Sequence, residues 1–400
     1  MKILILSHRV PFPQNGGYAI VVTNTIKGLV NEGHEVSLVA LNAKRNSHDS
    51  SLPDEDLMGK INYRAYDIDT TVTMLGVAIN LFSKTSFNID RYYDPEFETL
   101  LIRELRNRDY DIIQFEGLFV SLYLPVVRKH SNAKLIYRAH NIENQIWWRL
   151  SQQKIDPFKK SYLRMHARRI KNYEQQQLNK FDAITVFTRQ DKNTLTEYGI
   201  NVPIEIMPVG LRLERYKPNI RKTEFPSLFF LGSLDWLPNR EGVEWFLESF
   251  INDITSGALP VKLYVAGNDI PERFDDYEAL GKIFIQGEVD SALEFVNSKS
   301  IMIVPLLSSG GMRVKIVEGM AMQKCIISTS LGAEGINFTN GHDILIANNH
   351  DEFFHAIQRC IRDEEFCIQL GKNARLLAEK EHDINVVIKN LVAFYKACCK

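Results

Sequence analysis

The chain has 400 residues, of which 45% are hydrophobic and 24% charged, a composition typical of folded globular proteins rather than disordered ones. Lys and Arg total 48 against 49 for Asp and Glu, so the balanced charge argues against a surface built to bind nucleic acid. No apolar run reaches the roughly 18–20 residues that span a bilayer. We therefore expect a cytoplasmic protein of two or three domains. The five cysteines, at 325, 360, 367, 398 and 399, follow no metal-binding spacing and are expected to be reduced thiols.

In the first half of the chain, short apolar runs alternate with longer helical stretches. Near-continuous apolar strands separated by helices predict a parallel sheet that is covered on both faces. Strands are expected at 3–6, 35–41, 111–115, 134–138, 183–187 and 204–208. Helices are expected near 18–32, 96–108, 119–130, 144–179 and 189–198.

The alternation breaks at about 208–218 and then starts again, which indicates a linker followed by a second domain of the same kind. Strands are expected at 227–232, 261–267, 282–287, 300–306 and 325–330, and helices near 239–250, 290–298, 312–322 and, at least twice, within 350–399. The predicted fold is α/β, with two doubly wound, Rossmann-like domains that face a central cleft. We place them at 1–208 and 209–382, and expect a helical tail, 383–400, to pack back across their junction.

Two glycines follow the first predicted strand, where the chain enters a helix. Gly16 and Gly17 let the backbone approach an anion closely, and the free amides of a helix N-terminus favour a phosphate or an acceptor group. A plain strand-to-helix turn explains the same pair, and that alternative stays open.

A polar cluster follows the predicted strand 134–138. His140 lies at the carboxyl end of that strand, where ligands gather in doubly wound sheets, and its ring can hydrogen-bond a substrate hydroxyl. Its neighbours Asn141 and Glu143 supply further polar groups, but they are also explained as caps of the next helix.

The segment 304–336 carries the strongest signal in the chain. A buried strand ends there in a Ser/Gly loop that opens a helix, and loop amides with a helix N-terminus suit a diphosphate. Positive side chains on that helix strengthen such contacts, and a carboxylate one turn further along can accept hydrogen bonds from ribose hydroxyls. A surface ion pair explains the charges but not the glycine loop. The residues are Gly310 and Gly311 in the loop and Arg313, Lys315 and Glu318 on the helix.

Two further features have less specific interpretations. Residues 149–171 contain eight Lys or Arg and one acid, Asp156, which fits a solvated helix face or a peripheral contact with anionic lipid at the inner face of a membrane. Asp67 and Asp69 form a DxD pattern that holds a metal in some enzymes, and we interpret them as part of a solvated connection.

Several of these segments carry a resemblance to a known family. The most specific is SSGGMRVKIVEGMAMQKCIISTSLGAEGI, and the others are MKILILSHRVPFPQNGG, YRAHNIE, FLGSLDWLPNREGVEWF and IQGEV. Together they resemble glycosyltransferase family 4, whose members have the two-domain GT-B fold, and the resemblance covers nearly the whole chain. It implies a C-terminal domain that binds a nucleoside-diphosphate sugar and an N-terminal domain on the acceptor side.

The resemblance also implies roles in donor binding. Glu318 matches the second acid of the family's Glu-x7-Glu motif and is expected at the ribose. The first acid falls at position 310, where this chain has Gly310, so the carboxylate usually placed near the transferred sugar is missing. Backbone amides of Gly310, Gly311 and Met312 are expected to replace it.

The family's basic pair often includes an arginine directly after the glycine of the first strand of the C-terminal domain. Ser233 stands at that place, and we expect Arg313 and Lys315 to supply the charge that neutralises the diphosphate. With these cations, neither a metal nor a cofactor is expected.

The remaining family positions are matched more simply. His140 matches the histidine of the N-terminal domain that lies close to the donor sugar. Gly17, with Gly16 before it, matches the glycine near the diphosphate. Val289 lies where backbone contacts usually hold the nucleobase.

The resulting hypothesis is a retaining glycosyltransferase that uses His140, Arg313 and Lys315 to move a sugar to a glycan or lipid-linked acceptor hydroxyl, in surface polysaccharide or lipid-linked glycan assembly. Two alternatives stay open: a nucleotide-sugar epimerase on the same fold, and a non-catalytic subunit that binds sugar nucleotides.

Overall fold

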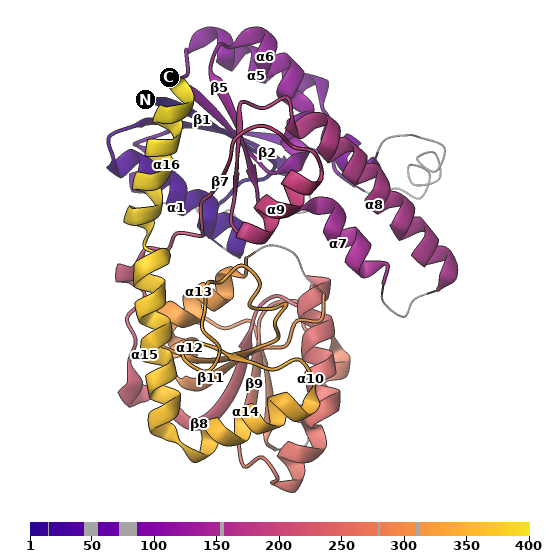
Figure 1. Cartoon of the computed structure of the whole chain (residues 1–400), viewed down its shortest axis with the longest axis vertical. Coiled ribbons are helices and arrows are strands. Elements are labelled where there is room, and N and C mark those ends of the chain that lie inside the picture. The colour runs from indigo at the N-terminus through magenta and orange to yellow at the C-terminus, as the bar shows by residue number, and fades with distance from the viewer. Residues whose placement is uncertain (15, 44–54, 72–85, 153–155, 279–280, 309–311) are drawn as a thin grey trace. The chain divides into compact units, whose positions relative to one another are not determined.

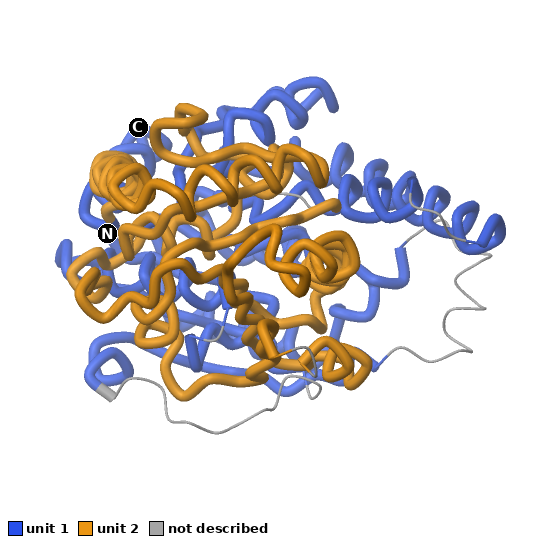
Figure 2. The backbone as a smooth tube through the Cα atoms, turned by 90° about the horizontal axis from the view of Figure 1, so that it is seen from below, with its two compact units in different colours: residues 1–210, 384–400 blue, residues 211–383 orange. Residues whose placement is uncertain are grey.

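The computed structural model describes the chain except for residues 15, 44–54, 72–85, 153–155, 279–280 and 309–311. The described residues form two compact units (Figures 1 and 2). Unit 1 consists of Met1–Gly210 together with Ile384–Lys400, and unit 2 is Leu211–Asp383. The last helix of the chain thus belongs to the first unit.

Unit 1 is built on a parallel sheet of seven strands in the order β3-β2-β1-β4-β5-β6-β7. This is the doubly wound arrangement, in which the chain moves first to one side of β1 and then to the other. The strands are β1 (Lys2–Ser7), β2 (Glu35–Ala43), β3 (Asn62–Ile68), β4 (Ile112–Glu116), β5 (Lys134–Ala139), β6 (Ala183–Val186) and β7 (Ile204–Ile206).

Helices cover both faces of this sheet. They are α1 (Gly17–Asn31), α2 (Glu55–Met58), α4 (Phe87–Asp90), α5 (Pro95–Asn107), the 3₁₀ helix η2 (Leu118–Tyr123), α6 (Leu124–His130), α7 (Glu143–Leu150), α8 (Pro157–Leu178), α9 (Arg189–Glu197) and α16 (Ile384–Cys399). Figure 1 shows α7 and α8 side by side, projecting from the rest of the unit.

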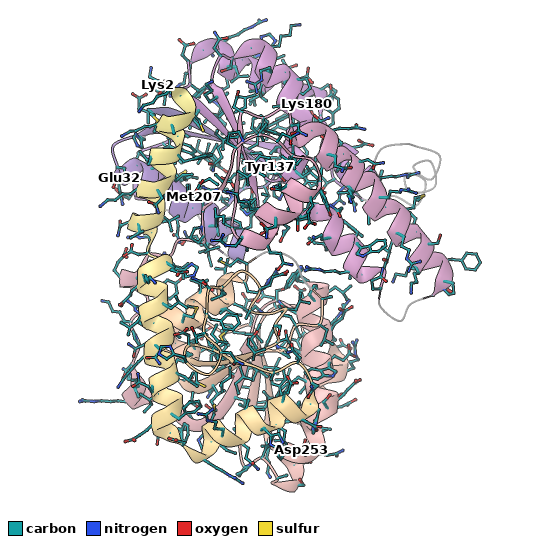
Figure 3. All side chains as sticks on the ribbon, viewed as in Figure 1. Lys2, Glu32, Tyr137, Lys180, Met207 and Asp253 are labelled. Carbon is teal, nitrogen blue, oxygen red and sulfur yellow. The ribbon has the colours of Figure 1, made fainter. Side chains whose placement is uncertain are left out.

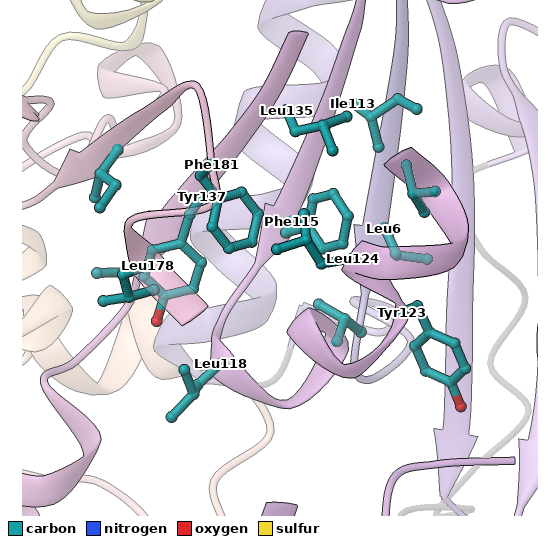
Figure 4. Close-up of a cluster of buried hydrophobic side chains, with 14 of the residues drawn as sticks. Leu6, Ile113, Phe115, Leu118, Tyr123, Leu124, Leu135, Tyr137, Leu178 and Phe181 are labelled. Carbon is teal, nitrogen blue, oxygen red and sulfur yellow. The ribbon is translucent and has the colours of Figure 1, made fainter. Parts of the chain in front are cut away.

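The core of unit 1 follows from strand alternation, because successive side chains of a strand point to opposite faces. In β1, Ile3 and Ile5 pack with α1 and α16, whereas Leu4 and Leu6 pack on the other face with α5 and α6. Figure 4 shows part of that second face, where the Phe181 ring lies 5.4 Å from the ring of Tyr137. In Figure 3, Tyr137 points inward from β5, whereas Lys180 lies at the surface.

Unit 2 repeats the same plan with a parallel sheet in the order β10-β9-β8-β11-β12-β13. Its strands are β8 (Glu224–Leu231), β9 (Lys262–Ala266), β10 (Ile283–Gly287), β11 (Lys299–Val304), β12 (Cys325–Ser328) and β13 (Leu345–Ile346). Its α-helices are α10 (Leu237–Ser256), α11 (Asp275–Glu278), α12 (Ala292–Asn297), α13 (Val314–Ala321), α14 (His350–Arg362) and α15 (Glu364–Glu381), and its 3₁₀ helices are η3 (Leu213–Arg215), η4 (Ile220–Lys222) and η5 (Glu272–Phe274). The prediction of two doubly wound α/β domains is therefore confirmed.

Two local predictions were wrong. The single helical region expected at 144–179 is two helices, because the Asp156 side chain accepts hydrogen bonds from the amides of Phe158 and Lys159 and starts α8 anew, with Pro157 in its first turn. The connection expected around Asp67 contains the edge strand β3, although both acids of the DxD pattern are exposed.

The order of the strands marks where a ligand site belongs. In each sheet the crossovers change side next to the first strand, between β1 and β4 in unit 1 and between β8 and β11 in unit 2. Doubly wound sheets bind ligands at the carboxyl ends of the strands beside this point. Among the described residues, no helix is both long enough and apolar enough to cross a bilayer.

Candidate active site

In unit 1, an acid and an imidazole meet at the carboxyl ends of β4 and β5. Glu116 is the last residue of β4, and His140 directly follows β5. The Nε2 atom of His140 lies 2.6 Å from Oε2 of Glu116, and the two side chains are 10% and 0% exposed. The predicted site residue His140 is therefore held by a buried carboxylate.

The surroundings of this pair fix its charges. Burial lowers the pKa of His140, and the hydrogen bond to Glu116 opposes that shift only in part. Burial alone would raise the pKa of Glu116, but the nearby Arg138 guanidinium and the bond from His140 hold it below its usual value. At neutral pH Glu116 is thus ionised and His140 is neutral, with its proton on Nε2 facing the carboxylate.

Aromatic rings enclose the imidazole. Its centroid lies 4.5 Å from that of the Tyr18 ring and 5.4 Å from that of Phe187. The Arg9 guanidinium lies 4.2 Å from the centroid of the Tyr18 ring, and the Tyr18 hydroxyl lies 2.6 Å from Oγ of Ser7. These contacts bring the loop after β1 and the first turn of α1 beside His140.

The two glycines predicted at this loop begin α1. Gly17 is the first helical residue, and Gly16 precedes it with φ 100° and ψ 164°, a conformation that L side chains rarely adopt. The Gly16 carbonyl accepts a hydrogen bond from the amide of Ile20 at 3.1 Å. The turn itself therefore requires glycine at 16, whatever ligand the helix N-terminus meets.

In unit 2, Lys315 of α13 reaches the loop that follows β8. Its Nζ donates a hydrogen bond to Oδ1 of Asn239 at 2.9 Å and lies 4.1 Å from the centroid of the Phe230 ring. A Cβ atom on Gly232 would come within 2.6 Å of that Nζ, so the glycine leaves room for the ammonium. Burial, with Arg313 nearby, lowers the pKa of Lys315 to about 7.

The structure brings three of the predicted donor-site residues, Ser233, Arg313 and Lys315, together around this loop. Arg313 is 7% exposed and its Cζ lies 5.1 Å from the centroid of the Trp236 ring. Asn239 donates to the carbonyl of Ser233 at 2.7 Å, while the Ser233 hydroxyl donates to Asp235 at 2.6 Å. Ser233 supplies no positive charge at the position of the family's arginine, but the ammonium of Lys315 lies beside the same loop.

Glu318 lies one turn after Lys315 and bonds a different partner. The hydroxyl of Tyr216 donates to Oε1 of Glu318 at 2.9 Å. Burial raises the pKa of Glu318, and the Tyr216 hydrogen bond and the charge of Lys315 oppose the shift. A surface ion pair between Lys315 and Glu318 is thus not the arrangement found, because the lysine bonds Asn239 instead.

The remaining predicted donor residues are placed less fully. Met312 is buried directly before α13, and Val289 is half-buried just after β10. Gly310 and Gly311 lie outside the described residues. Ser308, just before them, donates to Oε2 of Glu241 at 2.9 Å.

The described part of the chain contains no group of three or more His, Cys, Asp or Glu that is placed to hold a metal ion. The five cysteines are free thiols, and Cys325, Cys360 and Cys367 are buried together in unit 2, where the first two sulfur atoms lie 3.5 Å apart. We assign no ligand to this sulfur cluster.

Sequence reasoning missed three residues that contact the predicted ones. Glu116 holds His140, Asn239 holds Lys315, and Tyr216 holds Glu318. One signal was available for the first: Gln114 and Glu116 are polar, lie two positions apart in an otherwise apolar strand, and so share one face. The partners of Lys315 and Glu318 lie 76 and 102 residues away in the sequence, and no local pattern marks them.

Comparison with known families gives the class of the protein. Residues 15–215 match the family described as Glycosyltransferase Family 4, and residues 225–363 match the family described as Glycosyl transferases group 1. The chain therefore belongs to glycosyltransferase family 4, which confirms the resemblance seen in the sequence.

Solved structures with the same fold agree with this assignment. A sucrose-phosphate synthase from Thermosynechococcus elongatus is 14% identical with a TM-score of 0.74, and 99% of each chain is covered. Anabaena Alr3699/HepE in complex with UDP and glucose is 13% identical with a TM-score of 0.68, covering 99% of this chain and 100% of that one. The chain has the GT-B fold of these neighbours.

A relative covers almost the full length of the sequence. It is a 44.6 kDa protein in the cps region of Klebsiella pneumoniae, 22% identical over 401 residues, and the match covers 98% of both chains.

Proposed function

We propose that the protein is a retaining glycosyltransferase that moves a sugar from a nucleoside-diphosphate sugar to an acceptor hydroxyl. In this proposal unit 2 binds the donor and unit 1 binds the acceptor. The observation that carries it is the position of Lys315, whose ammonium donates to the amide oxygen of Asn239 and lies beside the buried guanidinium of Arg313. Two cations gathered at the carboxyl end of a central strand suit a diphosphate.

The proposed roles of these residues follow from the negative charge that develops on the leaving diphosphate during sugar transfer. The bond between the sugar and the diphosphate breaks, the acceptor oxygen bonds to the sugar carbon on the same face, and the acceptor proton passes to a diphosphate oxygen. The leaving diphosphate gains negative charge as its bond breaks, so Lys315, Arg313 and the amides that begin α13 stabilise the transition state more than the ground state. We assign no protein base and no metal to this step.

The other residues bind and orient the donor. Glu318, held by Tyr216, accepts hydrogen bonds from the ribose hydroxyls, and Val289 contributes backbone contacts to the nucleobase. Ser233 and Met312 line the diphosphate through their backbone, together with Gly310 and Gly311. His140 contacts the transferred sugar.

Binding of nucleotides tests the donor site directly. Thermal unfolding is measured with UDP, GDP, ADP, CMP and dTDP, with and without EDTA, on wild type and Glu318→Ala. A ligand at 100 times its dissociation constant stabilises by about 2.7 kcal/mol, which shifts the midpoint by several degrees. We expect a shift with one nucleotide that EDTA does not change and that Glu318→Ala loses. No shift with any nucleotide would contradict the proposal, and loss of the shift in EDTA would contradict metal independence.

We place the reaction in surface polysaccharide or lipid-linked glycan assembly, and the relative in the Klebsiella cps region supports this. The complex of Anabaena Alr3699/HepE with UDP and glucose makes a uridine nucleotide the first donor to test. Transfer is measured with a panel of radiolabelled nucleotide sugars and lipid-linked acceptors. A product with inverted anomeric configuration would contradict the retaining mechanism.

We further propose that the α7–α8 pair contacts anionic lipid. Phe158 at the start of α8 is 87% exposed and Trp148 of α7 is 50% exposed, and exposed basic residues, Lys159, Arg164 and Arg168, lie along α8. Basic residues with exposed aromatic side chains suit the membrane interface.

Sedimentation with vesicles tests this contact. The protein is expected to bind vesicles containing phosphatidylglycerol and not vesicles of phosphatidylcholine alone. Phe158→Ser is expected to weaken binding, whereas Leu376→Ser, which changes a 63% exposed residue of α15, serves as the matched control. Equal binding by both variants would contradict the proposal.

A further inference from the structure

Two buried polar side chains of β4, Gln114 and Glu116, lie on one face of the sheet next to His140. In β4, Ile112, Gln114 and Glu116 alternate with Ile113 and Phe115, so they point to the sheet face that α1 and α16 cover. Gln114 and Glu116 are both 0% exposed. A polar amide and a carboxylate on a covered face each require a hydrogen-bonding partner within the protein.

Those partners form a chain that begins on the last helix. The Tyr395 hydroxyl of α16 donates to the side-chain oxygen of Gln114, whose amide nitrogen donates to Oε1 of Glu116. The second carboxylate oxygen, Oε2, accepts from Nε2 of His140 at 2.6 Å. Four buried side chains thus connect the C-terminal helix to the imidazole.

The chemistry of the groups allows only one direction for these bonds. An ionised carboxylate accepts and never donates, so Gln114 presents its NH2 group to Glu116 and turns its carbonyl oxygen to Tyr395. That oxygen can then only accept, and the Tyr395 hydroxyl donates to it. By the same rule His140 carries its proton on Nε2.

Charged neighbours keep Glu116 ionised. The Nη1 atom of Arg138 lies 3.4 Å from Oε1 of Glu116 and donates to the Thr25 hydroxyl on α1 at 2.9 Å. His8, in the loop after β1, lies 2.9 Å from the Glu116 carbonyl through Nδ1, and burial lowers its pKa to about 3, so it stays neutral. The Arg9 guanidinium acts on both histidines from the same loop.

We propose that Glu116 is a positioning residue that fixes the tautomer and ring orientation of His140, and that Gln114 and Tyr395 hold its carboxylate in place. The part of the inference that concerns sugar transfer rests on the proposed function. The C-terminal helix then contributes to the geometry of the site through the bond from Tyr395 to Gln114.

Replacing the acid by its amide gives a specific expectation. In Glu116→Gln, the donors Gln114 and Arg138 still require an acceptor, so the new side chain turns its oxygen toward them. Its NH2 group then faces Nε2 of His140, which must accept instead of donate, and the imidazole proton moves to Nδ1. Glu116→Gln therefore reverses the tautomer of His140.

Nuclear magnetic resonance of protein labelled with ¹⁵N in its histidines measures this reversal without substrate. The His140 signals are assigned from their absence in His140→Gln. We expect protonated Nε2 in wild type and protonated Nδ1 in Glu116→Gln. Glu104→Gln is the matched control, because Glu104 is also 0% exposed and accepts from Tyr110 at 2.6 Å within unit 1. Unchanged His140 signals in Glu116→Gln would overturn the proposal.

Tyr395, at the other end of this series of hydrogen bonds, provides a second variant in which the packing of the aromatic ring is kept. Tyr395→Phe removes one hydroxyl and is expected to shift the His140 signals and to lower kcat by roughly twofold to tenfold, the size of one lost hydrogen bond. Tyr110→Phe is its control, since that hydroxyl donates to Glu104. If Glu116→Gln fails to fold, unchanged His140 signals in Tyr395→Phe overturn the proposal.

Kinetics separate this inference from the proposed function. Glu116→Gln is expected to lower kcat by roughly tenfold to 10²-fold, the size of one hydrogen bond to a charged group, with little change in KM for the donor. A reversed tautomer supports the positioning role even where no sugar transfer is found, and the absence of transfer in wild type counts only against the proposed function. Full turnover together with an unchanged tautomer overturns the positioning role.

Discussion

The sheets of units 1 and 2 have the same strand order apart from the additional edge strand β7 of unit 1, but the two units differ in how a buried charge is neutralised. In unit 1, Glu116 faces the guanidinium of Arg138 at 3.4 Å and the ring of His140 at 2.6 Å, and the chain itself holds the pKa of the acid low. In unit 2, Lys315 bonds a neutral amide beside a second cation, and its pKa falls to about 7.

This difference indicates which unit is prepared for an anion. A buried charge that its own chain neutralises is a fixed part of the structure, because removing one partner leaves the other uncompensated. A buried cation whose pKa is lowered gains most when an anionic ligand arrives and restores its charge. We therefore interpret the cluster of unit 1 as rigid support for His140 and the cluster of unit 2 as the receptor for a diphosphate.

The largest expected effect sharpens the assignment of unit 2. Lys315→Met is expected to lower kcat by the equivalent of roughly 2.7–4 kcal/mol, as for the loss of one donor to a developing oxyanion. Initial rates of sugar transfer measure it. Lys262→Met is the control, because that lysine is 53% exposed and pairs with Glu224. Near-full turnover in both Lys315→Met and Arg313→Met would remove the proposed basis for diphosphate stabilisation.

A measurement of unfolding free energy compares α1, which follows β1 in unit 1, with α10, which follows β8 in unit 2. A Cβ on Gly242 of α10 would lie 2.3 Å from the backbone oxygen of Pro305, whereas a Cβ on Gly28 of α1 would meet the side chain of Ile388 at 2.4 Å. We expect Gly242→Ala to cost about 1–3 kcal/mol. Gly28→Ala should cost less, because a side chain can rotate and alanine favours the helix by about 1 kcal/mol. Equal losses in urea unfolding would contradict this difference.

The pH dependence of binding tests the charge state of Lys315. Because its pKa is about 7 in the free protein, Lys315 is largely neutral at pH 8 and must take up a proton to pair with a diphosphate. The dissociation constant of the nucleoside diphosphate should therefore rise above pH 7, by up to about tenfold per pH unit. Calorimetry in two buffers of different ionisation enthalpy measures the proton uptake.

A single substitution serves as the control for this pH dependence. Lys315→Arg keeps its charge throughout this range, so it should bind with little dependence on pH between 7 and 9. A wild-type protein that binds the nucleotide without taking up a proton would show that Lys315 is already charged in the free state.

The smallest expected effect concerns the support of Glu318. Tyr216→Phe removes the hydroxyl that donates to this carboxylate at 2.9 Å, and we expect nucleotide binding to weaken by about 1 kcal/mol. Titration of the nucleotide measures the change. Tyr264→Phe is a matched control, because its hydroxyl donates to Glu224 at 2.8 Å in the same unit. An equal effect of both substitutions would argue against a role for Tyr216 at the donor site.

Much of the fold could be predicted because its signals are local. Apolar runs such as residues 3–6 and 300–306 became the central strands β1 and β11, since a strand covered on both faces must be apolar along its length. The edge strand β3 was missed because its sequence, NYRAYDI, faces solvent along part of its length and does not carry that pattern. The division of residues 144–179 depended on one capping side chain, Asp156.

The sequence by itself determined the family, the two doubly wound sheets, the strand end at which His140 stands and the helix that carries Lys315 and Glu318. Those features depend on the periodic spacing of apolar residues and on short motifs, both of which are local in the sequence. Only the tertiary structure decided the partners, because Glu116, Asn239 and Tyr216 come from other segments, 24, 76 and 102 residues away in the sequence. Whether a buried charge is neutralised depends on which elements pack beside it, and no local pattern of residues records that packing.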